Sequence, residues 1–387
     1  MSEKGEFSIE ILQGIHRISE KEWDRLVPPD DPFMTHAFLH ALEESGSASI
    51  NTGWMPLHIL CRRENRLVGG APLYLKNHSY GEYIFDWGWA DAARRAGVPY
   101  YPKLLSAVPF TPASGRRLLI PTGEHDSNIE RALLSGMMHV AKESRAQSLH
   151  ILFCTEQEHQ ELGSIPGIVP RTTFQYHWTN PGVSNFEEWL SLMRARRRKE
   201  IRRERRVPKD LDVEIRVVPG ADLTENDWQV LESFYRDTVE RKWGQPYLTP
   251  DFFKLARVRL AHLALGILAV HDGEIQASAL FFQRGSNLYG RYWGCRPGYE
   301  RLHFELCYHR PIELCLTEGW TRFEAGAQGD HKISRGLLPA PTHSVHWVRH
   351  TGLSDAVQTW MDEESQTNIQ TMEKLAKHGP FRKQEPE

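Results

Sequence analysis

An internal repeat constrains the fold of this chain more than any other feature of its sequence. Two segments of the first half align without gaps, at a constant offset of 208 residues, with two segments of the second half. They are Ile59-Leu60-Cys61 and Leu67–Tyr74, which match Ile267-Leu268-Ala269 and Ile275–Phe282. Each copy alternates apolar residues on both sides of a tight turn, which is the pattern of an antiparallel hairpin. Hairpins resemble one another, so a chance match is the alternative, but the ungapped length favours two similar α/β halves.

The match extends beyond the hairpins. Asp86-Trp87-Gly88 aligns with Tyr292-Trp293-Gly294 after a two-residue gap. Each copy is therefore predicted to contain two hairpin strands, a third strand and a loop that leads into a helix. The third strands are predicted at Tyr83–Trp89 and Leu288–Cys295, and residues 54–110 and 264–320 are expected to superpose.

The length of the chain and one strong break predict two domains. A chain of 387 residues is long for one hydrophobic core, and Asn180-Pro181-Gly182 is its clearest break. We therefore expect an N-terminal domain of residues 1–180 and a C-terminal domain of residues 181–387. After the break, Phe186–Arg206 has the apolar spacing of one long helix. The polar tail from Ser365 is expected to fray.

Composition and missing motifs exclude several classes of protein. The net charge of −3 is ordinary for a globular protein, and no run of eighteen apolar residues predicts a membrane span. The five cysteines are scattered without a C-x-x-C pair, which indicates reduced thiols and a cytoplasmic protein. His343-x-x-His346 does not have zinc-site spacing, so no metal is expected. The missing G-x-S-x-G, Walker A and G-x-G-x-x-G motifs exclude common hydrolases, NTPases and dinucleotide-binding proteins.

Phe323–Gly336, with the sequence FEAGAQGDHKISRG, concentrates titratable side chains behind a short strand. Thr321–Ala327 alternates like a strand, and glycines follow it. The titratable residues after the glycines are Asp330, His331, Lys332 and Arg335. Loops at strand ends often carry function in α/β folds. The alternative is a surface loop that happens to be charged.

Arg194–Arg206 is the most strongly charged stretch of the chain. It contains nine basic and two acidic residues, a net charge of +7 against −10 for the rest. Arginine matches phosphate groups bidentately, so we expect Arg198, Arg202 and Arg205 to be open to tRNA or another phosphorylated anion. The alternative is a solvated helix whose arginines pair with the acidic residues elsewhere.

Two further segments carry weaker signals. Arg296–Phe304 joins a strand to a helix, where backbone N–H groups can bind a phosphate or an oxyanion. His303 and Glu305 open that helix, although Glu305 also suits the helix dipole. In the segment Arg241–Leu248, Arg241 and Tyr247 are candidates to line a substrate groove, and a plain turn is the alternative.

Five stretches of the chain are long and unusual enough to be compared with a known family. They are YYPKLLSAVPFTP (Tyr100–Pro112), RRRKEIRRERR (Arg196–Arg206), RKWGQPYL (Arg241–Leu248), LHFELCY (Leu302–Tyr308) and EAGAQGDHKISRG (Glu324–Gly336). Together they resemble the FemAB-like, peptidoglycan-biosynthesis-related group of the GNAT acyltransferase superfamily. The resemblance implies an α/β (α+β) fold of two tandem GNAT-like domains, each a mixed, mainly antiparallel sheet flanked by helices.

The same resemblance implies transfer of an acyl or aminoacyl group to an amine acceptor. Acyl-CoA is the donor in GNAT enzymes and aminoacyl-tRNA in the Fem transferases, so either is the expected co-substrate, and no permanently bound cofactor is expected. Arg296–Phe304 lacks the glycines with which GNAT enzymes hold the CoA pyrophosphate, and in this it resembles the Fem branch. The non-catalytic alternative is a module that binds RNA or an anionic cell-envelope precursor.

The resemblance also implies where the site lies, in a cleft between Leu288–Cys295 and Thr321–Ala327, where GNAT sheets part. We expect His331 or Glu324 to be the general base, with His303 and Glu305 as the next candidates. The remaining cleft residues are expected to be Arg291, Trp293, Gln328, Lys332 and Arg335, the last two holding the negative charge of the donor. If Glu324 instead pairs with Arg291 across the strands, its role is structural.

Overall fold

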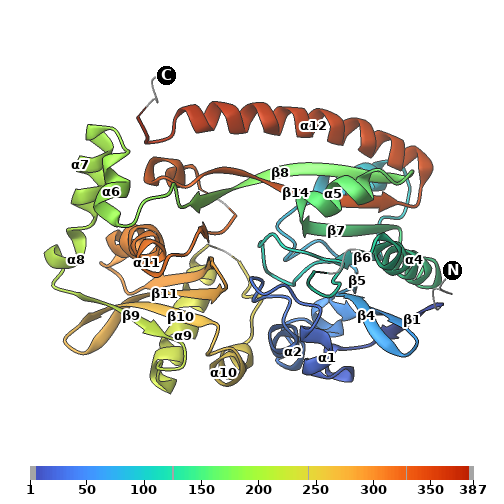
Figure 1. The fold of residues 1–387 in the computed structure, drawn as a ribbon, viewed down its shortest axis with the longest axis horizontal. Coiled ribbons are helices and arrows are strands. Elements are labelled where there is room, and N and C mark those ends of the chain that lie inside the picture. The colour runs from blue at the N-terminus through green and yellow to red at the C-terminus, as the bar shows by residue number, and fades with distance from the viewer. Residues whose placement is uncertain (1–5, 124–125, 243, 328, 383–387) are drawn as a thin grey trace. The chain divides into compact units, whose positions relative to one another are not determined.

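The computed structural model describes residues 6–123, 126–242, 244–327 and 329–382, which form two compact units (Figure 1). The first unit contains the chain up to Thr173 together with Pro341–Ile369, and the second contains Phe174–Ala340 and the chain from Gln370. The chain therefore leaves the first unit a few residues before the expected boundary at 180. In the described part of the chain, no helix is long and apolar enough to cross a membrane.

The first unit contains two sheets. The smaller sheet has the order β1-β3-β4, with β1 (Phe7–Leu12), β3 (His58–Arg63) and β4 (Arg66–Ala71). The strands of the larger sheet are β2 (Met55–Pro56), β5 (Tyr74–Lys76), β6 (Lys103–Ser106), β7 (Ser148–Cys154), β14 (Leu338–Val348) from Pro341 and β8 (Ile168–Thr179) up to Thr173. The helices are α1 (Glu20–Asp24), α2 (His36–Glu44), α3 (Trp87–Arg95), α4 (Ser127–Glu143), α5 (Glu156–Gly163) and, up to Ile369, α12 (Thr351–Lys377).

Helix α4 covers the small sheet and encloses the core of the first unit. Its buried residues include Ile129, Leu133 and Met137, which join Ile59 of β3 in one apolar cluster. The helix approaches the sheet closely because β4 has a glycine at the contact: a Cβ atom at Gly69 would lie 2.5 Å from a methyl group of Ile129.

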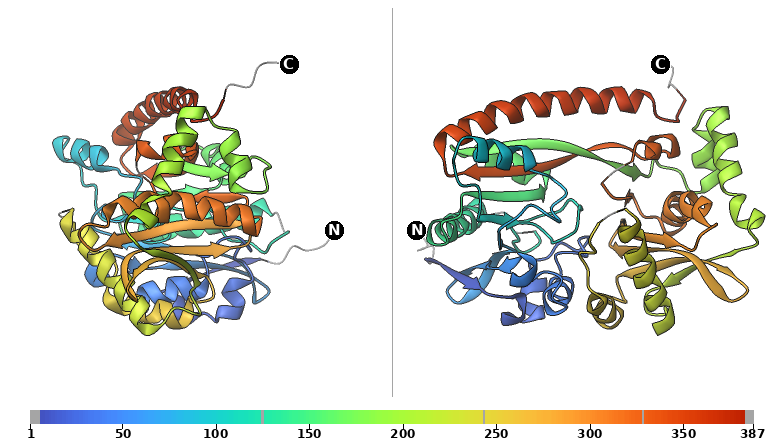
Figure 2. Two further views of the ribbon diagram at one scale, coloured as in Figure 1. Left: turned by 90° about the vertical axis from the view of Figure 1, so that its left-hand side faces the viewer. Right: turned by 180° about the vertical axis from the view of Figure 1, so that it is seen from behind.

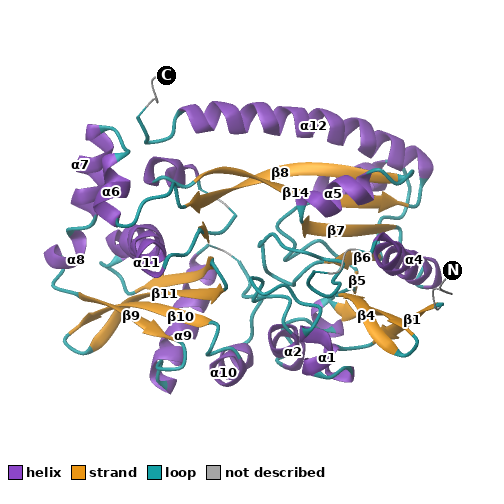
Figure 3. Cartoon of the chain, in the orientation of Figure 1, coloured by secondary structure: helices purple, strands orange, loops and turns teal. Residues whose placement is uncertain are grey.

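The second unit has one sheet, in the order β8-β13-β12-β11-β10-β9 (Figure 3). Its strands are β8 from Phe174, β13 (Arg322–Glu324), β12 (Asn287–Cys295), β11 (Glu274–Arg284), β10 (Ala264–His271) and β9 (Glu214–Pro219). The β12–β13 pair is parallel and the other pairs are antiparallel. The helices are α6 (Phe186–Ser191), α7 (Ala195–Glu204), α8 (Val207–Asp210), α9 (Glu225–Arg241), α10 (Pro250–Arg259) and α11 (Arg310–Glu318), preceded by a π-helical turn, Glu305–His309.

Helices cover both faces of this sheet (Figure 2). On one face, Tyr292 stacks edge-on with Tyr235 of α9, and a Cβ at Gly294 would lie 2.5 Å from Phe234 of the same helix. On the other face, Ile267 and Phe281 pack in a core with residues of α6 and α11, among them Trp189. The mixed α/β architecture with a mainly antiparallel sheet in each unit confirms the expected fold class.

The predicted repeat is confirmed at the level of the hairpins. Both β3–β4 and β10–β11 are antiparallel, and their registers coincide at the predicted offset: Ile59 pairs with Ala71, and Ile267 pairs with Ala279. Both hairpins also have their register shift at the equivalent place, after Cys61 and after Ala269. The repeat in the sequence therefore predicted both hairpins, and their registers are equivalent at the offset of 208 residues.

The predicted repeat is wrong beyond the hairpins. Tyr83–Trp89 is not a strand: Trp87 opens α3, and the segment before it is irregular. The second tryptophan-glycine pair, at Trp293, does lie in a strand, β12. The two tryptophan-glycine pairs thus lie in different elements: the first pair opens helix α3, and the second lies near the end of strand β12.

Two other predictions about the second half are wrong. Phe186–Arg206 is not one helix, because α6 ends at Ser191 and Met193 forms an isolated β-bridge with Phe381. The backbone N–H of Arg194 also donates to the carbonyl of Pro380. Up to Arg382, the tail from Ser365 does not fray as expected. Helix α12 continues to Lys377, and the described segment after it pairs with the break between α6 and α7. Residues 383–387 lie outside the described residues.

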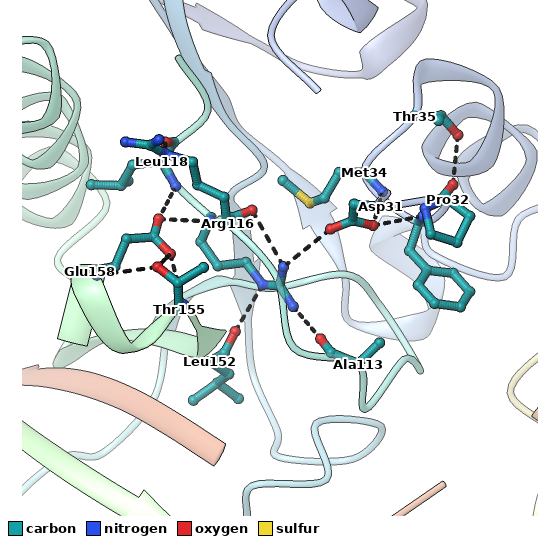
Figure 4. Close-up of polar contacts among 12 residues, drawn as sticks. Asp31, Pro32, Met34, Thr35, Ala113, Arg116, Leu118, Leu152, Thr155 and Glu158 are labelled. Carbon is teal, nitrogen blue, oxygen red and sulfur yellow. Dashed lines mark hydrogen bonds and ion pairs between the residues drawn. The ribbon is translucent and has the colours of Figure 1, made fainter. Parts of the chain in front are cut away.

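A buried carboxylate anchors the segment after the Tyr100–Pro112 stretch in the first unit (Figure 4). Glu158 accepts hydrogen bonds from the backbone N–H groups of Arg117 (2.8 Å) and Leu118 (2.7 Å). The Arg117 guanidinium in turn donates to the carbonyl of Leu152 at 2.9 Å and lies 3.9 Å from Asp31. Glu158 thus gives hydrogen-bond partners to the backbone N–H groups of Arg117 and Leu118, which do not lie in a strand.

The Tyr100–Pro112 stretch itself is centred on a fully buried lysine, Lys103. Its ammonium group donates to Ser79 Oγ (2.7 Å), Glu82 Oε2 (2.7 Å) and Asp86 Oδ2 (2.6 Å). Burial disfavours the charge, but Glu82 and Asp86 raise the pKa of Lys103 above its usual value. Nearby, burial lowers the pKa of Lys76 to about 7. Lys103 therefore carries the charge that balances two buried carboxylates.

We expect Lys103→Met to destabilise the protein by about 3–5 kcal/mol, because the change leaves two buried carboxylates without their shared cation. Chemical unfolding followed by tryptophan fluorescence measures the effect. Lys142→Met, at an exposed position near the end of α4, is the control and should change stability by no more than about 0.5 kcal/mol. Equal stability of the two variants would contradict the structural role assigned to Lys103.

Candidate functional site in the second unit

The candidate site lies where strands β12 and β13 separate. They pair through three residues each, Asn287–Tyr289 with Arg322–Glu324, while β12 continues beside β11 to Cys295. The strand expected over Thr321–Ala327 is thus shorter than predicted. The chain turns away after it at Gly326, which has φ +81° and so adopts a conformation that favours glycine.

An aromatic and imidazole cluster lies at the open end of β12. The ring of His303 contacts Trp293 of β12, with centroids 5.2 Å apart, and Tyr308 of the π-helical turn, with centroids 5.3 Å apart. The hydroxyl of Tyr308 lies 2.9 Å from Nε2 of His331, and the two histidine rings are 6.0 Å apart. The structure therefore brings together three residues predicted for the site, Trp293, His303 and His331, with a tyrosine that was not predicted.

The pKa values of both imidazoles in this cluster lie below the ordinary histidine value. Burial, aided by the neighbouring His331, lowers the pKa of His303 to about 4. Burial and the charges of Arg335 and Lys332 also lower the pKa of His331. In contrast, burial raises the pKa of the Tyr308 phenol, which stays protonated. The cluster thus combines two neutral proton acceptors with a proton donor.

The turn Asp330–Arg335 is tied to the unit by its own charged residues. Asp330 accepts a hydrogen bond from the hydroxyl of Tyr176 at 2.6 Å. Lys332 is 2% exposed and donates to the carbonyl of Gly326 at 2.7 Å, and burial lowers the pKa of this lysine to about 8. Arg335 donates two hydrogen bonds to Glu204 of α7. Arg335 is therefore occupied by a carboxylate and is not open to a donor as expected.

Glu324 faces a different group of residues. It lies opposite His177 of β8 in the antiparallel ladder, with Glu324 Oε2 3.8 Å from His177 Nε2. Among the described residues, its other ion-pair partner is Arg322, at 3.0 Å, so the alternative pairing with Arg291 is not observed. Gln328, also predicted for the cleft, lies outside the described residues.

Glu305 does not join the imidazole cluster. It is 1% exposed and lies 3.5 Å from Arg205 Nε and 3.3 Å from Arg310 Nη2. Burial raises the pKa of this carboxyl group, and the two guanidinium groups oppose the shift. Glu305, expected as a candidate general base, is instead held in ion pairs with Arg205 and Arg310.

The basic helix is tied down more than its sequence predicted. Arg205 donates two hydrogen bonds to Glu313 (2.7 and 3.0 Å), so the expectation that it is free for an anionic partner is wrong. Arg198 donates to the carbonyl of Met193 at 2.6 Å, which leaves it partly engaged. Arg202 is half exposed and pairs with the exposed Glu187. Of the three predicted anion-binding arginines, Arg202 has the most exchangeable partner.

Arg241 and Tyr247 lie at the end of α9 and after it. Arg241 is exposed and pairs with Asp237 one turn earlier, at 2.8 Å. The backbone N–H of Tyr247 donates to the hydroxyl of Tyr235 at 3.0 Å. These contacts are those of a helix end and the turn that follows it, and a role in substrate binding stays a prediction for both residues.

Comparison with known proteins identifies the family. The family model for FemAB-like proteins, described as peptidoglycan biosynthesis/recognition, matches residues 14–383. The chain is a FemAB-like protein. No match was found among curated protein sequences.

Solved structures with a similar fold were also found. FemX shares 13% sequence identity with a TM-score of 0.53, over 88% of this chain and 98% of FemX. The C-terminal domain of a putative lysylphosphatidylglycerol synthetase from Agrobacterium fabrum shares 10% identity with a TM-score of 0.52, over 89% of this chain and 94% of that one. A tandem GNAT protein of the clavulanic acid biosynthesis pathway shares 12% identity with a TM-score of 0.47, over 89% of this chain and 99% of that one. At these identities the similarity shows the fold alone.

Several site residues of this FemAB-like chain were missed by sequence reasoning. Tyr308 lies within the LHFELCY stretch. Its position beside His331 depends on the π-helical turn, which no sequence pattern predicts. Gln175 and His177 alternate with the aromatic residues Phe174, Tyr176 and Trp178, which is the pattern of a strand and was the one available signal. Among the described residues, no group of three or more histidines, cysteines and carboxylates could hold a metal ion.

We expect Arg205→Gln to destabilise the protein by about 2 kcal/mol, because it leaves Glu305 buried beside only one guanidinium. Arg202→Gln, which breaks an exposed pair on the same helix, should cost no more than about 0.5 kcal/mol. Thermal and urea unfolding of the two variants measures the difference. If both variants are as stable as the wild type, the ion pairs of Arg205 do not anchor α7.

The pKa of His303 predicts a dependence of stability on pH. Between its ordinary value of 6.5 and its folded value of about 4, the unfolded chain binds a proton that the folded chain does not. The free energy of unfolding should therefore fall as the pH is lowered through this window, by up to about 1.4 kcal/mol per pH unit for this group. In His303→Gln the decline should be shallower by this amount. Parallel curves for variant and wild type would show that His303 titrates normally.

Proposed function

We propose that this protein transfers an acyl or aminoacyl group to a primary amine, with the cluster of His303, Tyr308 and His331 as its acid–base centre. The observation that carries the proposal is a pair of neutral imidazoles in contact with a protonated phenol. These groups lie beside the place where β12 and β13 separate. Membership of the FemAB-like family supports the same class of reaction.

The proposed chemistry needs one group that accepts a proton and one that donates a proton. The amine nitrogen attacks the carbonyl carbon of the donor, and a neutral imidazole, His331 or His303, takes the proton that the amine loses. As the bond from the carbonyl carbon to the leaving group breaks, the Tyr308 hydroxyl donates its proton to the departing sulfur or oxygen. The 2.9 Å contact between Tyr308 and His331 then allows the proton to return to the phenol.

The loop Arg296–Phe304 favours aminoacyl-tRNA over acyl-CoA as the donor. The backbone N–H of Gly298 points at the carboxylate of Glu300, with contacts of 3.1 and 3.2 Å. Hydrogen bonds from the backbone N–H groups of Glu300 and Gly298 lower the pKa of this carboxyl group, which stays ionised. The Glu300 carboxylate thus takes up a backbone N–H group of the loop that the resemblance to GNAT enzymes would assign to a pyrophosphate, which supports a donor other than acyl-CoA. Exposed arginines of α7, such as Arg202, remain available to an RNA phosphate.

Turnover assays with both donors and a primary amine test the proposal. We expect His331→Ala and Tyr308→Phe to lower kcat by about 100-fold or more, as the loss of a general base or acid does. His271→Ala, at the partly exposed end of β10, is the control and should retain full activity. Melting temperatures of the variants show whether they fold.

The outcomes separate the alternatives. Amine-dependent release of uncharged tRNA supports the aminoacyl donor, and release of free thiol supports acyl-CoA. Full activity of both His331→Ala and Tyr308→Phe would remove the cluster from the mechanism. Salt-dependent RNA binding without turnover of either donor would support the non-catalytic binding module instead.

A further inference from the structure

Buried hydrogen-bond acceptors without donors gather on one face of strands β8 and β13. Gln175 is 3% exposed, His177 9% and Glu324 3%. Gln175 Oε1, His177 Nε2 and both carboxylate oxygens of Glu324 are inaccessible to solvent and have no hydrogen-bond partner among the described residues. Buried polar atoms are paired in nearly all folded proteins, so a group of unpaired atoms at one place needs an explanation.

The three side chains are brought together by the ladder of the second unit. Glu324 lies directly opposite His177, and Gln175 precedes His177 by two residues, so it projects from the same face of β8. Tyr176, between these two residues, and Trp178, directly after His177, project from the opposite face and belong to the apolar core. The group therefore lies on the face of the sheet away from that core, next to the separation of β12 from β13.

The protonation states in this group leave several acceptor atoms that need a hydrogen-bond donor. Burial lowers the pKa of His177, so its ring is neutral and one ring nitrogen is an acceptor. Arg322 lies 3.0 Å from Glu324 Oε1 and balances the charge of the carboxylate, but the contact is not aligned as a hydrogen bond. A buried acceptor left without a hydrogen bond has lost its contacts with water and gained none in return, which costs free energy. A ligand that supplies several N–H donors would recover this cost.

We propose that Gln175, His177 and Glu324 form a subsite that binds the primary ammonium group of a substrate. An ammonium has three N–H donors and no acceptor, which complements a site with three acceptor side chains. A quaternary ammonium has the same charge but no N–H donor, and a carboxylate has neither, so the subsite rejects both. This inference rests on the proposed function, because it gives the amine acceptor a place to bind in its ammonium form. The bound ammonium releases one proton to solvent before the free amine attacks, and the imidazole then takes the second proton.

The subsite is tested by equilibrium binding, without any acyl donor. The imidazole resonances of His177, assigned with His177→Gln, are followed by NMR while n-butylammonium, tetramethylammonium or butyrate is added. We expect a saturable shift with n-butylammonium alone. We expect Glu324→Gln to weaken this binding at least about tenfold, since it removes a charged acceptor. Glu318→Gln, an exposed carboxylate at the end of α11, is the matched control and should bind as the wild type does.

Three results would overturn the subsite. The first is no saturable shift of His177 with n-butylammonium, which is the result if ordinary water fills the group. The second is an equal response to tetramethylammonium, which would show that N–H donors are not recognised. The third is unchanged affinity in a folded Glu324→Gln variant. The ligand series uses the wild-type protein, so the test stands even if a variant fails to fold.

The failure of the subsite and the failure of the proposed function are distinguishable. Saturable amine binding at His177 with no turnover of either donor leaves the subsite in place and removes the transfer reaction. Amine-dependent turnover without any shift of His177 removes the subsite and leaves the reaction, whose acceptor must then bind elsewhere.

Discussion

The brief pairing of β12 with β13 is the constraint on which the functional half of the structure depends. Parallel strands gain hydrogen bonds with every added residue pair, yet this ladder ends after Tyr289 and Glu324. Two consequences follow from that ending. The end of β12 carries Trp293 out to meet His303, and the chain after β13 becomes a tight turn that presents His331. Had the two strands remained paired, these groups would have been held apart by a continuous sheet.

The sequence predicted the fold correctly where apolar and polar side chains alternate. The prediction failed where contacts between distant residues override the local sequence pattern. The two hairpins could be paired residue by residue because one face of each strand is buried and a shifted register would expose it. The segment around Trp87 has the composition of a strand but forms the start of a helix. The single helix predicted over Phe186–Arg206 is interrupted because Met193 pairs with Phe381, a contact between residues far apart in the sequence.

The candidate site was predictable in part for the same reason. His303 and His331 could be selected because each lies in a short segment rich in titratable residues, and the structure brings them together. The contacts of the other predicted residues depend on burial and on ion pairing. Neither of these can be read from the neighbouring residues in the sequence. Arg205 looks like a surface cation in the sequence but has buried and half-buried carboxylates as partners. His177 looks like a core residue of a strand, and only the register with β13 places it opposite Glu324.

The register shift shared by the two hairpins bears on the origin of the protein. A bulge moves every side chain beyond it to the opposite face of the sheet. A bulge is therefore seldom gained or lost unless the whole strand is repacked. Finding it after Cys61 in one unit and after Ala269 in the other points to a single ancestral unit that was duplicated and fused. The copies then diverged downstream of the hairpin. One uses that downstream segment to enclose Lys103 with buried carboxylates, and the other uses it to assemble β12 and the histidine cluster. The two units thus share the hairpin and its register shift, and they differ in the structure that follows it.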